Sequence, residues 1–377
     1  MSDIEGFSHI KFVNIFFGVD SSFNISTIQM SNSKLPTSII KKVGILGEGK
    51  MGTSIFNLLL DYDLELVWAC SQEADIDKIS RQITKRIKRS FEAGIIDRQR
   101  FDNLMQTPVT RNPGELHACD LVIEAVPEIL ELKKNLFEQL DKIVNPAAIF
   151  TSNSSSINPS EIAPHGPRAE KFAGLHFFYP VPLKNIVELT ISPETSDQTR
   201  YVLEAFLDTI HRRSITLVEK NSFILNKLFL DFQNEAFLIV QAGNCNLEQM
   251  DQLVKKHLFP FGVFDFCDHV GIDTMLASVL NYTRDYPHKE YFSPFIASLQ
   301  SLVTEARLGI KSQEGFYKYP KAEIPGDPPP GYEGIVEHLR QTWLSSSKRF
   351  TALAHLPIDD MNWAIKEYFG TDKGPFE

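Results

Sequence analysis

The chain has 377 residues, of which 43% are hydrophobic and 23% charged, as is ordinary for a globular protein of two or three domains. A nucleic-acid-binding protein normally presents a broad basic face, so the formal net charge of −10 argues against that class. No apolar run approaches the roughly 20 residues needed to cross a bilayer, so we expect no membrane span.

Residues 1–40 are rich in Ser and Asn and have no clear hydrophobic period, so we expect a poorly ordered tail. Its acidic residues Asp3, Glu5 and Asp20 fit neither a secretory signal nor an Arg-rich transit peptide. The four cysteines have no CxxC or zinc-like spacing, which favours reduced thiols over disulfides or a metal site. These features predict a cytoplasmic protein without bound metal.

Residues 41–222 alternate short apolar runs with amphipathic stretches of helical period. The runs predict buried strands at 43–46, 65–70, 120–127 and 147–153. Helical patterns lie at 51–60, at 75–104 with a break near Gly94, and at 131–144. Strands that alternate with helices are typical of a doubly wound parallel sheet, so we expect an α/β domain of Rossmann type.

From residue 223 the pattern changes to long amphipathic helices, predicted at 223–242, 247–257 and 294–306. Residues 223–321 are therefore expected to form an all-α C-terminal domain. The Pro-rich segment 322–331 is typical of a linker.

Residues 332–377 contain a short internal repeat. The segment 358–369 matches 247–258 in order and polarity, and the terminal segment 374–377 matches 262–265. We interpret residues 332–377 as a truncated second copy of the helical unit that packs against the first. Two unrelated amphipathic helices are the alternative. Exposed apolar helices of an incomplete repeat also favour a homodimer.

The sequence Gly47-Glu-Gly49-Lys-Met51-Gly52 follows the first predicted strand and opens the first predicted helix, which is the context of a dinucleotide-binding fingerprint. The first glycine permits the tight turn, the second lets a pyrophosphate approach the backbone, and the third allows close packing of helix on strand. Unpaired N–H groups and the helix dipole then hold the phosphates. We expect these residues to bind a dinucleotide; a packing turn is the alternative.

The fingerprint is incomplete at the end of the second strand. About twenty residues after the glycines, an acid normally binds the ribose hydroxyls. Here the sequence reads Ala69-Cys70-Ser71, no nearby Arg suggests a 2′-phosphate, and Asp75 lies too far along. NAD is therefore expected over NADP only as the default. Glu48 adds a mild repulsion toward a pyrophosphate unless it points to solvent.

One histidine, His176, lies in the apolar run that follows Gly174, and a carboxylate, Glu188, comes shortly after it. A histidine in this setting is either a packed core residue or a general base that the carboxylate holds. Neutral imidazole has an ordinary pKa of about 6.5, which suits a base near neutral pH.

Residues 41–320 resemble the L-3-hydroxyacyl-CoA dehydrogenases, which include the bacterial 3-hydroxybutyryl-CoA dehydrogenases. The resemblance rests on motifs in the family's order: the glycine turn, the stretch around His176, and the segments 123–128, 152–156, 223–227 and 315–319. It implies an NAD-dependent enzyme that oxidises the C3 hydroxyl of an L-3-hydroxyacyl-CoA. The implied substrate is short-chain and 3-hydroxybutyryl-CoA-like, in fatty acid or butyryl-CoA metabolism.

The resemblance also implies roles for single residues. His176 matches the general base and Glu188 the carboxylate that orients it, whereas Ser155 and Asn226 match residues that hydrogen-bond the C3 oxygen. Because Asn226 comes from the helical region, the active site is expected between the two domains. The respective alternatives are a core histidine, an edge-strand surface acid, a polar turn or helix cap, and an ordinary helix residue.

Further residues are expected around the ligands. Asn153 matches a position at the nicotinamide end, and Glu124 is expected either to orient the cofactor or merely to end a strand. The phosphates of coenzyme A need positive charge, and Lys85, Arg86 and Arg89 lie on the helical hairpin that, in the family, lies beside coenzyme A. A solvated basic helix face is the alternative.

Three positions depart from the family's pattern. Cys70 replaces the ribose-binding acid, Tyr179 adds bulk near the base, and Phe56 is expected to crowd the sheet. These changes suggest a divergent paralogue. Two other functions therefore stay open: a dehydrogenase of a free hydroxy acid or sugar acid, and a non-catalytic protein that binds a nucleotide or acyl-CoA.

Overall fold

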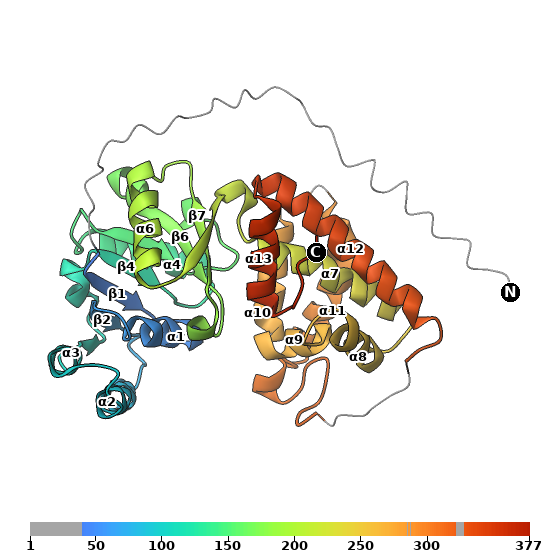
Figure 1. Ribbon diagram of the computed structural model, residues 1–377, viewed down its shortest axis with the longest axis horizontal. Helices are drawn as coiled ribbons and strands as arrows, with labels where there is room; N and C mark the ends of the chain where they lie inside the picture. The colour runs from blue at the N-terminus through green and yellow to red at the C-terminus, as the bar shows by residue number, and fades with distance from the viewer. Residues whose placement is uncertain (1–39, 285, 287, 322–327) are drawn as a thin grey trace, which may run out of the picture. The chain divides into compact units, whose positions relative to one another are not determined.

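The computed structural model describes residues 40–284, 286, 288–321 and 328–377. All but the last residue of the predicted tail, and residues 322–327 of the predicted linker, lie outside these ranges. Within them, an α/β region is followed by a helical region, coloured blue to green and yellow to red in Figure 1. This order agrees with the fold class that the sequence predicts.

The α/β region contains, among the described residues, an eight-stranded sheet in the order β3-β2-β1-β4-β5-β6-β7-β8. Its strands are β1 (Lys42–Leu46), β2 (Glu65–Ala69), β3 (Val109–Thr110), β4 (Leu121–Glu124), β5 (Ile149–Ser152), β6 (Phe172–Phe177), β7 (Ile186–Ile191) and β8 (Arg213–Val218). Neighbouring strands pair in parallel except for β6 and β7, which are antiparallel. Because a short connection joins these two strands, the sheet is mixed rather than wholly parallel as predicted.

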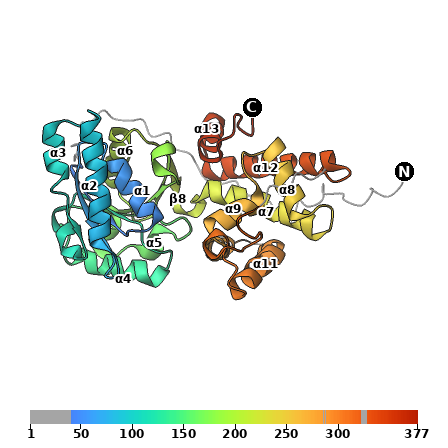
Figure 2. The same ribbon diagram turned by 90° about the horizontal axis from the view of Figure 1, so that it is seen from below.

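Helices cover both faces of this sheet, so it is doubly wound (Figure 2). They are α1 (Lys50–Leu59), α2 (Ile76–Glu92), α3 (Arg98–Leu104), α4 (Leu130–Asp141), α5 (Pro159–Ile162) and α6 (Asp197–Thr209). Apolar residues of α1, α2 and α6 share one core, whereas those of α4 and α5 belong to a second. Strand residues alternate between the two: Ile45 lies in the first core and Leu46 in the second.

The predicted helical hairpin is formed by α2 and α3, with Gly94 between them. Asp75 caps α2, because its carboxylate accepts a hydrogen bond from the Lys78 N–H at 2.9 Å. Asp75 therefore satisfies the helix end and does not replace the ribose-binding acid that is missing at the end of β2.

The helical region packs around one apolar core. It contains α7 (Ile224–Gln241), α8 (Leu247–His257), α9 (Val263–Val270), α10 (Ile272–Thr283), α11 (Ser293–Thr304), α12 (Tyr332–Ala354) and α13 (Ile358–Phe369). The sequence predicted α7, α8 and α11 individually, but not α9, α10 or α12. In the described part of the chain, no helix has the length and apolarity to cross a membrane.

The C-terminal helices α12 and α13 pack on the first helical unit, and α12 runs alongside α7 (Figure 1). Helices α8 and α13 each make a matching hydrogen bond with the segment that follows the helix. Asp251 accepts a hydrogen bond from the Phe264 N–H at 2.9 Å, and Asn362 accepts one from the Phe376 N–H at 3.1 Å. These positions correspond in the internal repeat; that residues 332–377 are a second copy of the helical unit stays a prediction.

Candidate active site

His176 and Glu188 face each other across two neighbouring strands. The antiparallel register of β6 and β7 pairs these two positions, and His176 Nδ1 lies 3.0 Å from Glu188 Oε2. Glu188 is fully buried and His176 is 6% exposed. The other carboxylate oxygen of Glu188 accepts a hydrogen bond from the Leu225 N–H at 3.3 Å. Glu188 is thus a buried partner of the imidazole and not a surface acid on an edge strand.

This hydrogen bond determines what the imidazole can do. A carboxylate only accepts hydrogen bonds, so it favours the tautomer in which the proton of neutral His176 is on Nδ1. The lone pair is then on Nε2, and the carboxylate stabilises the imidazolium that forms when Nε2 takes a proton. The ring packs on Phe178 at a centroid distance of 4.4 Å and on Phe223 at 6.1 Å. The pair therefore has the geometry of a general base and the residue that orients it.

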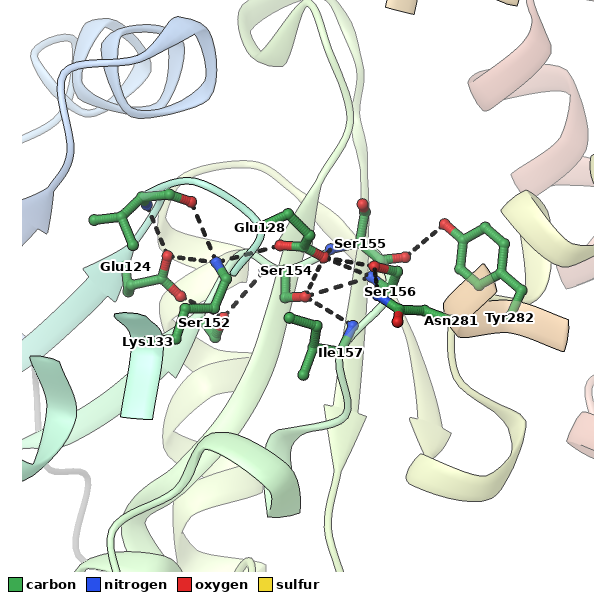
Figure 3. A network of polar contacts seen from close by, with 11 residues as sticks. Glu124, Glu128, Lys133, Ser152, Ser154, Ser155, Ser156, Ile157, Asn281 and Tyr282 are labelled. Atoms are coloured by element: carbon green, nitrogen blue, oxygen red, sulfur yellow. Dashed lines mark hydrogen bonds and ion pairs between the residues drawn. The ribbon is translucent and has the colours of Figure 1, made fainter. Parts of the chain in front are cut away.

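Ser155 lies in a loop after β5 whose shape depends on Glu128 (Figure 3). Glu128 Oε1 accepts hydrogen bonds from the N–H groups of Ser155 and Ser156 at 3.1 and 3.0 Å, and from the hydroxyls of Ser154 and Ser156 at 2.5 and 2.8 Å. Burial opposes the ionised form, but Lys133 and the serine donors outweigh it and lower the pKa of Glu128. The sequence did not predict that Glu128 shapes this loop, because the sequence shows only a single acidic residue after β4.

Glu124 is buried to one side of the same loop (Figure 3). Its carboxylate accepts hydrogen bonds from Lys133 Nζ at 2.6 Å, the Ser152 hydroxyl at 2.6 Å and the Val126 N–H at 2.7 Å. Burial raises the pKa of Glu124, although Lys133 acts in the opposite direction. Both oxygens are occupied and the side chain is 0% exposed, so the geometry favours an indirect role through the loop over direct contact with a cofactor.

Asn226 is held near Ser155 by two tyrosines that the sequence motifs do not include. Asn226 Nδ2 donates to the Tyr282 hydroxyl at 3.0 Å, and Tyr282 in turn donates to the Ser155 carbonyl at 2.6 Å. The Tyr368 hydroxyl donates to Asn226 Oδ1 at 2.9 Å. The helical region therefore contacts the serine loop here, and an active site between the two domains stays a prediction. Asn153 joins β6 to the loop, because its Oδ1 accepts the Phe177 N–H at 2.8 Å.

The glycine turn has the backbone geometry of a phosphate-binding loop. Gly47 has φ of +101°, and a Cβ there would lie 2.6 Å from the Ala125 carbonyl oxygen. A Cβ on Gly52 would lie 2.0 Å from the Gly47 carbonyl oxygen, whereas one on Gly49 would meet nothing within 4 Å. Gly49 is also the N-cap of α1, and no side chain caps this helix end, so its first N–H groups are left to bind an anion. The turn therefore fits a dinucleotide pyrophosphate.

Phe56 does not crowd the sheet. Its ring stacks on Trp68 with a centroid distance of 4.4 Å, and the Trp68 indole N–H donates to the Gly47 carbonyl at 2.9 Å. The predicted clash is wrong because β2 offers an aromatic partner of matching shape. The stacked pair instead supports the glycine turn through the hydrogen bond from Trp68 to Gly47.

Charged groups lie at the end of β2 although the position of the usual acid is Cys70. Glu48 accepts hydrogen bonds from the Ser71 N–H at 3.0 Å and from the Ser71 hydroxyl at 2.5 Å. Partial burial opposes ionisation, but these bonds outweigh it and lower the pKa of Glu48. Burial, together with the charge of Glu48, raises the pKa of the Cys70 thiol to about 11, and Arg111 acts the other way. An Arg is thus near in space, contrary to the expectation from the adjacent sequence.

The basic residues of α2 divide between two places. A shallow, open surface hollow of about 640 Å³ lies along one face of α2. It is lined by Arg81, Lys85, Lys88 and Arg89 together with the acids Asp77 and Glu92. Arg86 is not among its lining residues, because its guanidinium pairs with Asp61 at 3.0 Å. The predicted cluster therefore keeps Lys85 and Arg89 together and separates Arg86 from them.

Comparison with known proteins gives the same domain order. The family model described as "3-hydroxyacyl-CoA dehydrogenase, NAD binding domain" matches residues 42–221. The model described as "3-hydroxyacyl-CoA dehydrogenase, C-terminal domain" matches residues 223–319. A mitochondrial hydroxyacyl-coenzyme A dehydrogenase of Mus musculus is 32% identical over 290 residues, which is 74% of this chain and 92% of the relative.

Two bacterial proteins are about as similar, and a third shares the fold at lower identity. A probable 3-hydroxybutyryl-CoA dehydrogenase of Deinococcus radiodurans is 30% identical over 280 residues, 74% of this chain and 100% of the relative. The crystal structure of (S)-3-hydroxybutyryl-CoA dehydrogenase from Ralstonia eutropha has a TM-score of 0.66 at 30% identity and covers 75% of this chain and 100% of its own. The 3-hydroxybutyryl-CoA dehydrogenase of Escherichia coli shares the fold, with a TM-score of 0.73 at 19% identity, over 89% of this chain and 90% of its own.

Proposed function

Because the chain belongs to the 3-hydroxyacyl-CoA dehydrogenase family and is an NAD-dependent enzyme of that family, we propose that His176 and Glu188 carry its chemistry. In the oxidative direction, His176 Nε2 takes the proton of the C3 hydroxyl while the C3–H bond breaks. The C3–O single bond becomes a carbonyl, and NAD held at the glycine turn would supply the acceptor for the hydride that leaves C3. The observation that carries this proposal is the buried 3.0 Å pair of His176 and Glu188.

Ser155 and Asn226 are the proposed hydrogen-bonding partners of the C3 oxygen. Their support is geometric: Tyr282 bonds to both, so a side chain of α7 and the loop after β5 are held at one place. Two N–H groups of the loop donate to the Glu128 carboxylate, which constrains the loop backbone. Preorganised donors of this kind lower the barrier because they need no rearrangement as charge develops on the oxygen.

Glu48 is the proposed replacement for the missing ribose-binding acid. Its carboxylate lies at the end of β2 through its bonds to Ser71, beside Cys70, which stands at the usual acid position. An ionised carboxylate accepts hydrogen bonds from ribose hydroxyls and repels a 2′-phosphate. NAD would then be favoured over NADP by Glu48, against the opposing charge of Arg111, and not merely by default.

The hollow on α2 is the proposed place for the phosphates of an acyl-CoA substrate. Lys85 and Arg89 line it together with Arg81 and Lys88, which adds two cations to the predicted set. Arg86 already pairs with Asp61, so we assign it a smaller part in phosphate binding. The hollow also holds Asp77 and Glu92, so its cations exceed its acids by two, and this local excess of positive charge attracts an anionic substrate despite the net charge of −10.

The proposed substrate carries a short acyl chain, as in 3-hydroxybutyryl-CoA. The aromatic rings of Phe178 and Phe223 pack on His176 and place apolar surface beside the proposed base. A role in fatty acid or butyryl-CoA metabolism follows from that substrate class. Among the relatives, the mouse protein is named mitochondrial, whereas the sequence of this chain predicts a cytoplasmic location.

A reductive assay tests the proposed activity. The purified chain is mixed with NADH and acetoacetyl-CoA, with free acetoacetate in a parallel reaction, and the loss of NADH absorbance is followed. We expect turnover of the thioester that falls by at least about 10²-fold in His176→Gln. Turnover of the free acid alone would select the dehydrogenase of free hydroxy acids. Binding of both ligands without turnover would select the non-catalytic alternative.

A further inference from the structure

The C-terminal end of α13 contacts the segment that connects β6 and β7, the strands that carry His176 and Glu188. Lys184 Nζ donates to the carbonyls of Glu367 and Tyr368 at 3.0 and 2.9 Å, and the Asn185 N–H donates to the Glu367 carboxylate at 2.6 Å. The last carbonyls of a helix lack partners within the helix, so a cation is a favourable cap for them. These contacts hold the C-terminal unit against the hairpin formed by β6 and β7.

Tyr368 reaches from this attached end into the proposed active site. Its ring packs on Phe178 at a centroid distance of 4.4 Å, and Phe178 packs on His176 at the same distance. Its hydroxyl donates to Asn226 Oδ1 at 2.9 Å. Burial and the nearby charge of Glu188 raise the pKa of Tyr368, so the phenol keeps its proton and stays a donor.

The two tyrosines determine which way the Asn226 amide points. Tyr368 donates to Oδ1, and Nδ2 donates one of its protons to Tyr282. A side-chain amide has two N–H donors, so one N–H of Nδ2 is left over from the contact with Tyr282. If the amide were flipped, Oδ1 would face the Tyr282 oxygen, whose proton is already donated to the Ser155 carbonyl. Tyr282 therefore sets the orientation, and the Tyr368 hydroxyl reinforces it by donating to Oδ1.

We propose that Tyr368 is a positioning residue of the dehydrogenase reaction, acting by presenting an N–H of Asn226 to the C3 oxygen of the substrate. This inference rests on the proposed role of Asn226. It makes the C-terminal unit, which lies beyond residues 42–221 and 223–319 that match the family, part of the active site. The unit would then have a catalytic consequence in addition to its packing on α7.

Tyr368→Phe tests the proposal in the full chain, because it keeps the ring and removes the hydroxyl. We expect kcat/KM for acetoacetyl-CoA to fall about 3- to 10-fold, the value of one hydrogen bond, while the Kd for NADH stays unchanged. Tyr201→Phe, on α6, is the matched control and should leave both constants as they are. The same loss should appear at every pH, since the base itself is not altered.

A double variant distinguishes a positioning role of Tyr368 from general damage to the fold. In Asn226→Ala, the additional change Tyr368→Phe should have no further effect on kcat/KM, because the amide that Tyr368 orients is gone. Lys184→Met removes the contacts to the end of α13 and does not alter Asn226. It should also lower kcat/KM, and it replaces Tyr368→Phe as the test variant if that variant does not fold.

Two results would overturn the assignment while the proposed function stands. One is a kcat/KM of Tyr368→Phe equal to that of an active wild type. The other is an equal loss in the Asn226→Ala background. An inactive wild-type chain is a different outcome, because it would overturn the proposed function and, with it, any role for Tyr368 in the reaction.

Discussion

At the scale of single residues, His176 and Glu188 meet because one register of two antiparallel strands joins their positions. A shift of that register by one residue would turn one of the two side chains to the opposite face of the sheet. The pair therefore depends on backbone pairing and on the buried Leu225 N–H that holds the second carboxylate oxygen. Chemistry and fold are coupled at this point.

Glu188→Gln tests the orienting carboxylate. Glutamine fills the same volume but has no charge to stabilise the imidazolium and can present an N–H to Nδ1, which favours the wrong tautomer. We expect kcat to fall by about 10²- to 10⁴-fold with an unchanged Kd for NADH. Glu194→Gln, at an exposed position after β7, is the control. A kcat of Glu188→Gln within about twofold of wild type would contradict the role.

Glu48→Gln tests the ribose contact. The amide keeps the shape of Glu48 and loses its charge, so the affinity for NADH should fall about 10-fold, the value of one charge-assisted hydrogen bond. The affinity for NADPH should fall less or rise, because the repulsion of the 2′-phosphate is removed. Fluorescence titration with both nucleotides measures this ratio. Glu73→Gln changes the net charge equally from a nearby exposed position and should leave the ratio alone; an unchanged ratio in Glu48→Gln would exclude the contact.

At the scale of elements, α12 is attached to α7 by polar contacts as well as apolar ones. Asp231 on α7 pairs with Arg349 and accepts a hydrogen bond from the Ser346 hydroxyl at 2.7 Å. Burial raises the pKa of Asp231, although Arg349 opposes this shift. His338 on α12 lies 2.6 Å from Glu235 on α7. Helix α12 is thus fixed in register along α7 by side chains at two levels.

The His338 contact predicts a pH dependence of stability. The hydrogen bond to Glu235 raises the pKa of His338 above its ordinary value. Its contribution is fully present below the unfolded pKa of about 6.5 and is lost as the pH rises through the folded pKa. Because His338 is partly exposed, the effect is below about 1 kcal/mol, or roughly 2 °C in Tm. Thermal melts at pH about 6 and about 8 should show a larger drop for wild type than for His338→Gln.

The control for that measurement is His165→Gln, because His165 is exposed and lies away from α12. Its melting temperature should follow the wild-type pH dependence. Equal pH dependence in His338→Gln and wild type would show that the contact with Glu235 adds no net stability.

At the scale of the whole molecule, the C-terminal unit completes the helical core. Phe229, Phe232 and Phe259 pack with Trp343 and Phe369 in one aromatic cluster. The sequence favoured a homodimer because an incomplete repeat would leave apolar helices exposed. Those faces are instead buried within the described chain, so a homodimer stays a prediction that needs another surface.

Truncation after Gly331 tests this dependence. The shortened chain would lose several buried side chains, each worth about 1.5–3 kcal/mol, and the sum is comparable with the total stability of a domain. We expect a lower yield of soluble protein, a lower Tm and increased binding of an apolar fluorescent dye. A truncated chain with wild-type Tm and dye binding would show that the first helical unit is complete without α12 and α13.

Much of the fold follows from local patterns. The apolar runs predicted β1, β2, β4 and β5 to within a few residues, because strands buried on both faces leave little room for polar side chains. The strands β6 and β7 were not predicted from such runs, and they are the two that hold His176 and Glu188. Their pairing is decided by contacts across the sheet, so the antiparallel hairpin and its register were not readable from periodicity.

The amino-acid sequence by itself determined the family, the order of an α/β region and a helical region, the glycine turn and the residues His176, Glu188, Ser155 and Asn226 as candidates. Only the tertiary structure decided which residues contact these candidates. Glu128 accepts hydrogen bonds from the serine loop, Glu48 binds Ser71 at the end of β2, and Tyr368 donates to Asn226. The physical reason is that hydrogen bonds act over about 3 Å in space, whereas a sequence motif records only neighbours along the chain.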